Sequence, residues 1–334
     1  MVKAVRMHQN GGPEVLVWED LELPPPAAGE VRVRHTAISF NYSDVNVRRG
    51  GFYIANPLDF PVVLGNEAAG IVTDVGPGVS GVKPGDRVAY VGSGGPFYEK
   101  TGSYAEERNI LASCLILLPA TITDRQAAAF MLKGLTASLV INRNYKPKPG
   151  DAVLVHAAAS GVGLVLVQWC KHLGATVIGT VGSRNKAEVV RAHGCDHTIL
   201  YREQDFVKET RRIVPKGVAA VLDGVGKDTF EASLDCLRPF GILVNYGNAS
   251  GHPEPLDLIL LAKKGSLTVT RPAFSHHIAD PADAKAACDE LFDLVAKGAI
   301  KVEIGRTYPL RDAAQAHRDL EARTTSAGSV VFLP

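Results

Sequence analysis

The stretch VLVHAAASGVG, residues 153–163, says more about the fold of this chain than any other segment. Its first half is an apolar run typical of a buried strand, and its second half is a tight turn of small residues that leads into a helix. A helix that begins after such a turn presents free backbone N–H groups and a positive dipole end, which suit a pyrophosphate. The sequence therefore predicts that a dinucleotide binds at this turn, and His156 is interpreted as a packed strand residue rather than a base.

The glycine fingerprint of dinucleotide-binding turns is incomplete in this chain. Ala158 and Ser160 occupy its first two glycine positions, whereas Gly161 and Gly163 keep the rest. Such a fingerprint is a weak signal by itself, but here it lies inside a strand–helix–strand unit of the right length, which favours a dinucleotide over a packing turn. We expect Ser160, Gly161, Val162 and Gly163 to contact the cofactor.

Strands and helices alternate through the residues that follow this turn. Strands are expected at 176–181, 197–201, 219–225, 241–247 and 267–270, and helices at 160–175, 183–195, 204–214 and 227–239. A further helix is expected over 123–142, with Asp124 and Gln126 near its start as a cap. Near-continuous apolar strands separated by helices are typical of a parallel sheet covered on both faces. The pattern predicts a doubly wound nucleotide-binding domain over residues 125–271.

The beginning and the end of the chain have a different texture. Residues 1–124 contain short Val, Ile and Thr runs broken by Gly and Pro, such as EVRVRHTAIS at 30–39 and DRVAYVG at 86–92. These runs favour an antiparallel, barrel-like unit. The tail ends in the strand-like VVFL, which we expect to fold back onto this unit. The prediction is an α/β protein with one domain formed by 1–124 and 272–334 and another by 125–271.

Composition excludes several classes of protein. The chain has 334 residues, 46% of them hydrophobic, and its 36 basic and 35 acidic side chains leave a net charge of +1, which disfavours binding to nucleic acid or anionic membranes. No segment reads as a signal peptide or a transmembrane helix. The five cysteines are widely spaced and form no Cys-X-X-Cys pair, which argues against disulfides and cysteine-built zinc sites. We expect a cytoplasmic protein without membrane or nucleic-acid partners.

The residues after the expected strand at 176–181 indicate the cofactor. NAD-specific domains place a carboxylate there to bind the adenosine ribose. The segment VGSRNK, residues 181–186, contains no carboxylate but offers the Ser183 hydroxyl and the cations of Arg184 and Lys186. Because a 2′-phosphate needs hydrogen-bond donors and positive charge, the sequence predicts NADPH.

Several further segments carry a family resemblance. With GNEAAGIV at 65–72, LDCLRPFGILVNYGNASG at 234–251 and AHRDLEARTTSAGSVVFLP at 316–334, the chain resembles the medium-chain dehydrogenase/reductase superfamily. It is most similar to the zinc-independent quinone oxidoreductases, the zeta-crystallin group, over essentially its whole length. The resemblance implies a GroES-like, mostly β catalytic domain and a Rossmann cofactor domain.

The zinc ligands of the related alcohol dehydrogenases are missing. Where those enzymes have a cysteine and a histidine, this chain has Asn41 and Asn66, and the segment matching their structural zinc lobe, 91–102, has no cysteine. Amides are poor zinc ligands beside thiolate and imidazole, so we expect no metal. Without a Lewis acid, the site must rely on hydrogen-bond donors, which favours electron-poor acceptors such as quinones and conjugated enones.

The resemblance also implies the remaining site residues, although a purely structural role stays open for each. The catalytic candidates are Asn41, Tyr42, Asp44 and Tyr53, with Asn41 beside the nicotinamide and the substrate. The cofactor candidates beyond those given above are Thr136, Tyr201, Asn248, Ser250 and Arg323.

The predicted function is NADPH-dependent reduction of quinones by metal-free hydride transfer, with one-electron transfer left open. One alternative is a reductase of activated alkenes, namely enones or 2-haloacrylates. A second is a non-catalytic, crystallin-like NADPH-binding protein. The strand at 267–270 is expected at the edge of the Rossmann sheet, where it would pair two chains into a homodimer.

Overall fold

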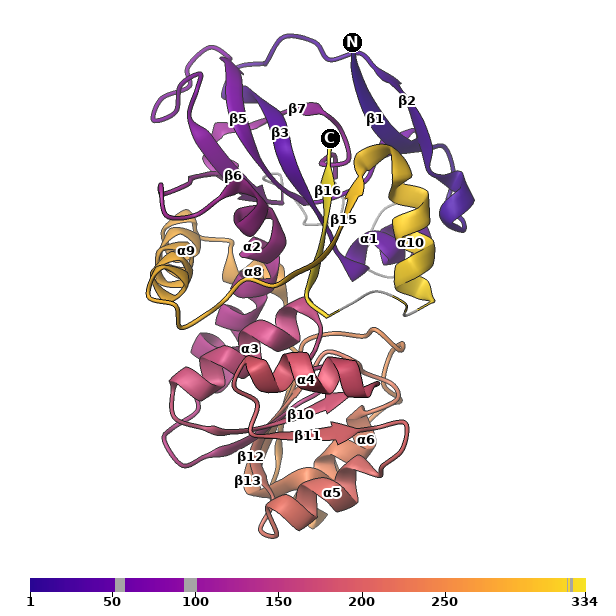
Figure 1. Cartoon of the computed structure of the whole chain (residues 1–334), viewed down its shortest axis with the longest axis vertical. Helices are drawn as coiled ribbons and strands as arrows, with labels where there is room; N and C mark the ends of the chain where they lie inside the picture. Colours follow the sequence, from indigo (N-terminus) through magenta and orange to yellow (C-terminus); the bar gives the residue numbers. More distant parts are fainter. Residues whose placement is uncertain (52–57, 93–100, 323, 325–326) are drawn as a thin grey trace. The chain divides into compact units, whose positions relative to one another are not determined.

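The computed structural model describes residues 1–51, 58–92, 101–322, 324 and 327–334. The chain divides into two compact units, one formed by residues 1–132 and 304–334 and the other by residues 133–303. Figure 1 shows the two units coloured along the sequence, with the end of the chain returning to the unit in which it began. No helix within the described ranges is long and apolar enough to cross a bilayer.

The first unit is mostly β-structure, as its Val- and Thr-rich runs predict. One sheet has the order β15-β16-β3-β5-β6-β8, with β7 also paired to β3, and a smaller sheet has the order β2-β1-β4. Apart from the parallel pair β15 and β16, all of these pairings are antiparallel. The strands are β1 Val2–Met7, β2 Val17–Leu21, β3 Glu30–Phe40, β4 Val62–Val63, β5 Glu67–Val75, β6 Arg87–Val91, β7 Glu107–Leu111, β8 Leu115–Leu117, β15 Ile304–Pro309 and β16 Ser329–Leu333.

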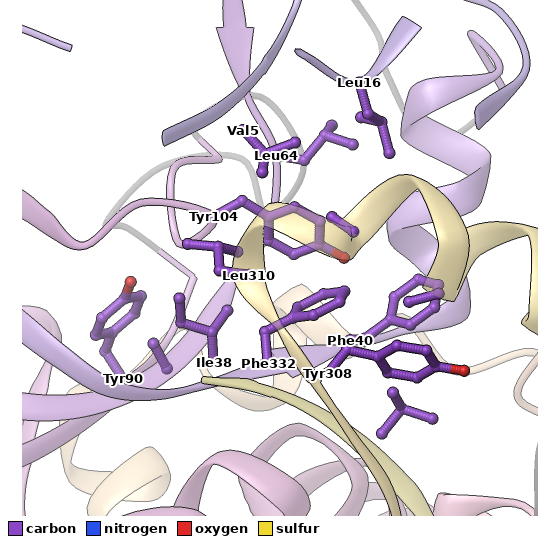
Figure 2. Close-up of a cluster of buried hydrophobic side chains, with 14 of the residues drawn as sticks. Val5, Leu16, Ile38, Phe40, Leu64, Tyr90, Tyr104, Tyr308, Leu310 and Phe332 are labelled. Atoms are coloured by element: carbon purple, nitrogen blue, oxygen red, sulfur yellow. The ribbon is translucent and has the colours of Figure 1, made fainter. Parts of the chain in front are cut away.

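Aromatic and branched side chains fill the interior of this unit. Phe332 of β16 contacts Phe40 of β3 and Tyr104, with ring centroids 5.5 and 4.9 Å apart. Figure 2 shows these three rings grouped, with Ile38 and Leu310 beside them. The helices of this part are α1 Tyr42–Arg48 and α10 Ala313–Glu321. The C-terminal strand thus folds back onto the first unit, as expected.

The second unit confirms the doubly wound prediction. Its six strands are all parallel and have the order β11-β10-β9-β12-β13-β14, which reverses direction beside β9. The strands are β9 Ala152–Val155, β10 Thr176–Val181, β11 His197–Leu200, β12 Val218–Asp223, β13 Leu237–Asn245 and β14 Thr268–Thr270. The strand expected at 267–270 therefore does lie at one edge of the sheet.

Helices cover both faces of this sheet. Figure 1 shows α3 and α4 on one side of β10 and β11, and α5 and α6 on the other. The helices are α2 Asp124–Ser138, which runs on from the first unit, α3 Gly161–His172, α4 Arg184–Ala192, α5 Phe206–Ile213, α6 Phe230–Ser233, α7 Leu258–Lys263, α8 Phe274–His277 and α9 Pro281–Ala296. The expected cap of α2 is confirmed for Gln126, whose side chain accepts from the Thr123 amide while the Thr123 hydroxyl accepts from the Gln126 amide. It is wrong for Asp124, whose carboxylate binds Thr36 and Arg87 instead. The short helices α1, α7 and α8 were not predicted.

The border between the units differs from the predicted domain border. The prediction assigned residues 272–334 to the first domain, but residues 272–303 group with the second unit. Polar contacts within the second unit hold this segment: Asp283 of α9 pairs with Arg143 at 2.6 Å, and the Lys301 amide donates to Gln168 at 2.8 Å. These contacts join residues more than 130 positions apart, and no local pattern in the sequence indicates them.

Candidate functional site

Asn41 and Asp44 occupy the start of α1 and hold each other in place. Asn41 is the N-cap residue, and its backbone amide donates to Oδ2 of Asp44 at 2.9 Å. Both side chains are buried. A carboxylate in the first turn of a helix also interacts favourably with the helix dipole. The structure therefore brings together two of the four predicted catalytic residues.

The amide group of Asn41 contacts a residue that the sequence reasoning missed. Nδ2 of Asn41 donates to Oε2 of Glu67 at 3.0 Å and to Oγ of Ser39 at 3.3 Å. Glu67 is fully buried at the start of β5, and its Oε1 accepts from the Leu132 amide at 2.7 Å. The signal for Glu67 was its place in GNEAAGIV, next to the missing zinc ligand. Because both amide hydrogens of Asn41 have acceptors within the protein, Asn41 has no hydrogen left with which to donate to a substrate.

A chain of buried polar side chains extends from Asp44 to the C-terminal helix α10. Oη of Tyr104 donates to Oδ2 of Asp44 at 3.1 Å and lies 3.3 Å from Nε2 of His317. Nδ1 of His317 lies 3.0 Å from Nη1 of Arg48, whose Nη2 donates to Glu321 at 2.6 Å. Burial, reinforced by the Asp44 carboxylate, raises the pKa of Tyr104 well above its ordinary value, so this phenol keeps its proton.

The other predicted residues of this part are less informative. Tyr42 is the first residue of α1 and is partly exposed. Tyr53 and the cofactor candidate Arg323 lie outside the described residues.

The dinucleotide turn has the expected geometry. Ser160 is the N-cap of α3, and its Oγ accepts from the Gly163 amide at 3.0 Å. A Cβ on Gly163 would overlap the carbonyl oxygen of Ala157 and lie 2.8 Å from the carbonyl carbon of Ala158, so only glycine fits here. Ala157 itself has φ of 50°, a left-handed conformation that is costly for a residue with a Cβ. The start of α3 therefore packs closely against the backbone of the turn that follows β9.

His156 confirms its interpretation as a core residue. It follows β9 directly, and its two ring nitrogens lie 3.0 Å from the Thr180 hydroxyl and 2.9 Å from the Ser233 hydroxyl. Burial lowers the pKa of His156. A neutral ring with both nitrogens engaged suits packing rather than proton transfer.

The residues predicted to bind a 2′-phosphate gather at the start of α4. Ser183 is the exposed N-cap, and Lys186 follows in the first turn. Tyr201 lies close by, since a Cβ on Gly182 would lie 2.7 Å from its hydroxyl. Arg184, however, pairs with Glu203 at 3.1 Å. Residues 181–186 contain no carboxylate, as predicted from the sequence. The fold nevertheless brings one close, because Glu203, which follows β11, lies beside this turn.

The remaining cofactor candidates lie after β13 and in α2. Asn248 is buried, and its Oδ1 has no hydrogen-bond partner in the described chain. The hydroxyl of Ser250 is engaged within the loops, because it donates to the Val225 carbonyl at 2.9 Å and accepts from the Asp228 amide at 3.0 Å. Thr136 is a partly buried residue of α2. Asn248 is thus the candidate with an unused buried atom.

Candidate metal ligands do not cluster in the parts of the chain that the structure describes. Those parts bring no three His, Cys, Asp or Glu side chains together in an arrangement that could hold an ion. All five cysteines are free.

Comparison with known proteins agrees with this architecture. Residues 27–120 match the family model of the alcohol dehydrogenase GroES-like domain, and residues 161–296 match that of the zinc-binding dehydrogenases. Quinone oxidoreductase 1 of Escherichia coli strain K12 is 43% identical over 335 residues, covering 99% of this chain and 100% of the relative. The chain belongs to the zeta-crystallin-like quinone oxidoreductases of the medium-chain dehydrogenase/reductase superfamily.

Other members of the superfamily are comparably similar. A 2-haloacrylate reductase of Burkholderia sp is 43% identical over 341 residues, covering 100% of this chain and 99% of the relative. The crystal structure of the Escherichia coli quinone oxidoreductase complexed with NADPH superposes with a TM-score of 0.92 and covers 99% of this chain and 100% of its own. The predicted pair of a GroES-like and a Rossmann domain is therefore confirmed.

Proposed function

We propose that this member of the quinone oxidoreductase group is an NADPH-dependent reductase of quinones that works without a metal ion. The observation that carries the proposal is the buried hydrogen bond between Asn41 and Glu67. The positions that the resemblance assigns to zinc ligands are occupied by amides, one of which is bound to a carboxylate. A site that offers hydrogen bonds but no Lewis acid favours an acceptor that is already electron-poor.

The described residues fit a dinucleotide phosphate. The start of α3 at Ser160–Gly163 would hold the pyrophosphate, while Ser183 and Lys186 would hold the 2′-phosphate, with Tyr201 beside the adenosine. Asn248 supports this fit, because its buried Oδ1 has no partner within the described chain and a bound cofactor would supply one. NADPH would supply the hydride, and the protein would orient the reactants and exclude water.

In this proposal the residues around α1 position the reactants. Glu67 and Ser39 hold the Asn41 side chain in one orientation, and Asp44 fixes its backbone. Tyr104 keeps its proton and holds Asp44 in turn. None of these groups needs to change its charge during reduction. Elemental analysis of the purified protein should find no stoichiometric zinc, and one equivalent would refute the metal-free site.

The relative from Burkholderia supports the alternative of a reductase of activated alkenes. Quinones and activated alkenes demand the same delivery of hydride to a conjugated carbon, so the fold alone favours neither. The non-catalytic alternative, a crystallin-like NADPH-binding protein, predicts that the cofactor binds and no acceptor is reduced.

A substrate panel tests the three functions together. 1,2- and 1,4-quinones, enones and 2-haloacrylate would each be mixed with enzyme and NADPH, and the NADPH absorbance followed. We expect turnover of quinones. Turnover of enones or 2-haloacrylate alone would replace the quinone assignment, and NADPH binding without any turnover would establish the non-catalytic role. Trapping of semiquinone radicals would separate one-electron from two-electron transfer.

The assembly that we propose is a homodimer through the edge of the parallel sheet, in the cytoplasm. Three large apolar side chains are exposed on β13 and α7, the elements that precede β14 in the chain, namely Phe240 at 82%, Leu258 at 73% and Ile259 at 57%. The Phe240 amide donates to the carbonyl of Gly265 at 2.8 Å, so the backbone at Phe240 lies beside the segment that leads into the edge strand. Exposed apolar groups next to an unpaired strand favour pairing with a second copy.

A further inference from the structure

Among the buried side chains that the structure describes, that of Asn66 leaves the most hydrogen-bonding atoms unused. Its side chain is 1% exposed, and neither Oδ1 nor Nδ2 has a hydrogen-bond partner among the described residues. No other described residue has two buried side-chain atoms in this state. A buried amide without partners destabilises a folded protein, because it has lost the hydrogen bonds that it made with water. Such a group calls for a functional explanation.

Backbone contacts hold Asn66 in place. Its carbonyl accepts from the Gly92 amide at 2.7 Å, and the carbonyl of Gly65 accepts from the amides of Gly102 and Ser103 at 2.8 and 3.1 Å. Glu67 begins β5 on the other side and pairs with Val91. Backbone hydrogen bonds therefore fix the chain on both sides of Asn66. The lack of side-chain partners is not explained by a poorly held loop.

The side chains of Glu67, the next residue, and of Asn41, which binds Glu67, have their partners already. Both carboxylate oxygens of Glu67 accept hydrogen bonds, from Asn41 and from the Leu132 amide. Both amide hydrogens of Asn41 are engaged by Glu67 and Ser39. Asn66 is thus the amide in this segment that still has two N–H groups to offer to a bound molecule.

We propose that Nδ2 of Asn66 donates a hydrogen bond to the carbonyl oxygen of the acceptor, which makes Asn66 a catalytic residue. This inference rests on the proposed function. When the acceptor takes up a hydride, the carbonyl π electrons move onto its oxygen, which then takes a proton from water, while NADPH is oxidised to NADP⁺. A fixed N–H donor in a buried site stabilises the negative charge that develops on this oxygen. The acceptor class is a neutral quinone or enone, because the buried Glu67 carboxylate next in sequence disfavours an anionic acceptor.

The test compares Asn66→Leu with Asn109→Leu. Leucine is close to asparagine in size, so Asn66→Leu removes the amide with little change in packing. The control removes an amide that is fully engaged, since Asn109 accepts from Arg32 at 3.1 Å and donates to the Pro24 carbonyl at 2.8 Å. For each variant kcat/KM with 1,4-benzoquinone, KM for NADPH and the urea midpoint of unfolding would be measured.

We expect Asn66→Leu to lower kcat/KM for the quinone about 100-fold while KM for NADPH changes less than about twofold. Its urea midpoint should equal or exceed that of the wild type, because an unsatisfied amide has been removed. The control should show the reverse, with a lower urea midpoint and unchanged kcat/KM. Asn66→Thr, which keeps a hydroxyl donor, should retain more activity than Asn66→Leu.

Two outcomes would overturn the inference. One is an Asn66→Leu enzyme with wild-type kcat/KM, and the other is a lower urea midpoint with no selective loss of quinone reduction, which would mean that the amide is structural. A wild-type enzyme that reduces neither quinones nor enones would instead refute the proposed function, so the two failures are distinguishable. Higher kcat/KM for 2-haloacrylate than for benzoquinone in the wild type would refute the neutral acceptor class.

Discussion

Nη1 of Arg48 lies 3.0 Å from Nδ1 of His317, and both side chains are completely buried. A guanidinium can only donate, so Nδ1 accepts and the proton of the neutral ring is on Nε2, facing Tyr104. Burial, with the adjacent Arg48 cation, lowers the pKa of His317 well below its usual value, which agrees with a neutral ring. Since Arg48 cannot give up a proton, this chain of side chains ends there and serves to position Asp44 rather than to carry protons.

Tyr104→Phe tests this positioning role. Loss of the hydroxyl removes the donor to Asp44, a buried carboxylate, and we expect the free energy of unfolding to fall by about 1–3 kcal/mol. The matched control is Tyr308→Phe, whose hydroxyl donates to Asp319 at 2.6 Å. Asp319 also accepts from Arg306 and Gln315, so it keeps partners when the hydroxyl is lost, and we expect less than about 1 kcal/mol. Urea unfolding followed by circular dichroism measures both variants, and equal losses would contradict the assigned importance of the buried hydroxyl.

Glu321→Gln tests the ion pair of Arg48. This variant leaves a fully buried guanidinium without its carboxylate, and we expect a loss of about 3 kcal/mol of stability. Asp283→Asn is the control, because its pair with Arg143 is more than half exposed on both sides and should contribute at most about 1 kcal/mol. A Glu321→Gln protein as stable as the control would show that solvent reaches Arg48.

Acid should destabilise the protein through its buried histidines. Nδ1 of His35 donates to the Ala105 carbonyl at 2.6 Å and Nε2 lies 2.9 Å from the Tyr90 hydroxyl, so the neutral ring is fully satisfied. Burial lowers the pKa of His35 from 6.5 to about 4. The unfolded chain therefore binds more protons between these values, so the contribution of His35 is complete above pH 6.5 and is lost as the pH falls towards 4.

The size of this effect is about 3 kcal/mol for His35 alone, and His156 and His317 act in the same direction. Between about pH 7.5 and about pH 5 the loss from His35 should be about 2 kcal/mol, because pH 5 lies above the folded-state pKa of about 4. Urea unfolding at the two pH values measures this loss. In His35→Gln the difference between the two conditions should shrink, even though the variant is less stable at neutral pH. If the stability of His35→Gln falls between the two pH values as much as that of the wild type, groups other than His35 cause the acid sensitivity.

Lys186→Ala tests the choice of cofactor. If Lys186 binds the 2′-phosphate, its loss should raise KM for NADPH about tenfold or more and leave KM for NADH nearly unchanged. Lys208→Ala is a suitable control, because Lys208 is an exposed residue of α5 that pairs with Asp205. Equal changes in both Michaelis constants would refute the phosphate role.

Ile259→Asp tests the proposed dimer. A charge placed among the exposed apolar side chains of β13 and α7 should be tolerated in a monomer but costly in an interface. Light scattering at micromolar concentration should report a dimer for the wild type and a monomer for the variant. A monomeric wild-type protein would contradict the proposed assembly.

Local patterns accounted for most of the elements and for the turn at the start of α3. The alternation of apolar strands with helices predicted the parallel sheet, and the small residues of 157–163 predicted the helix start, because both depend on neighbours in the chain. The cap of α2 and the packed His156 were predictable for the same reason. The unpredicted helix α7 has only six residues, too few for a clear period.

What the sequence determined by itself was therefore the fold class, the family and the identity of the amides at Asn41 and Asn66. Only the tertiary structure decided which hydrogen-bond partners those amides have. Glu67 reaches Asn41 because β5 pairs with β3, and His317 reaches Arg48, 269 positions earlier, because the C-terminal strand returns beside β3. Strand pairing sets such contacts between residues far apart in the chain. As a result the side-chain amide of Asn41 has hydrogen-bond partners, whereas that of Asn66 has none among the described residues.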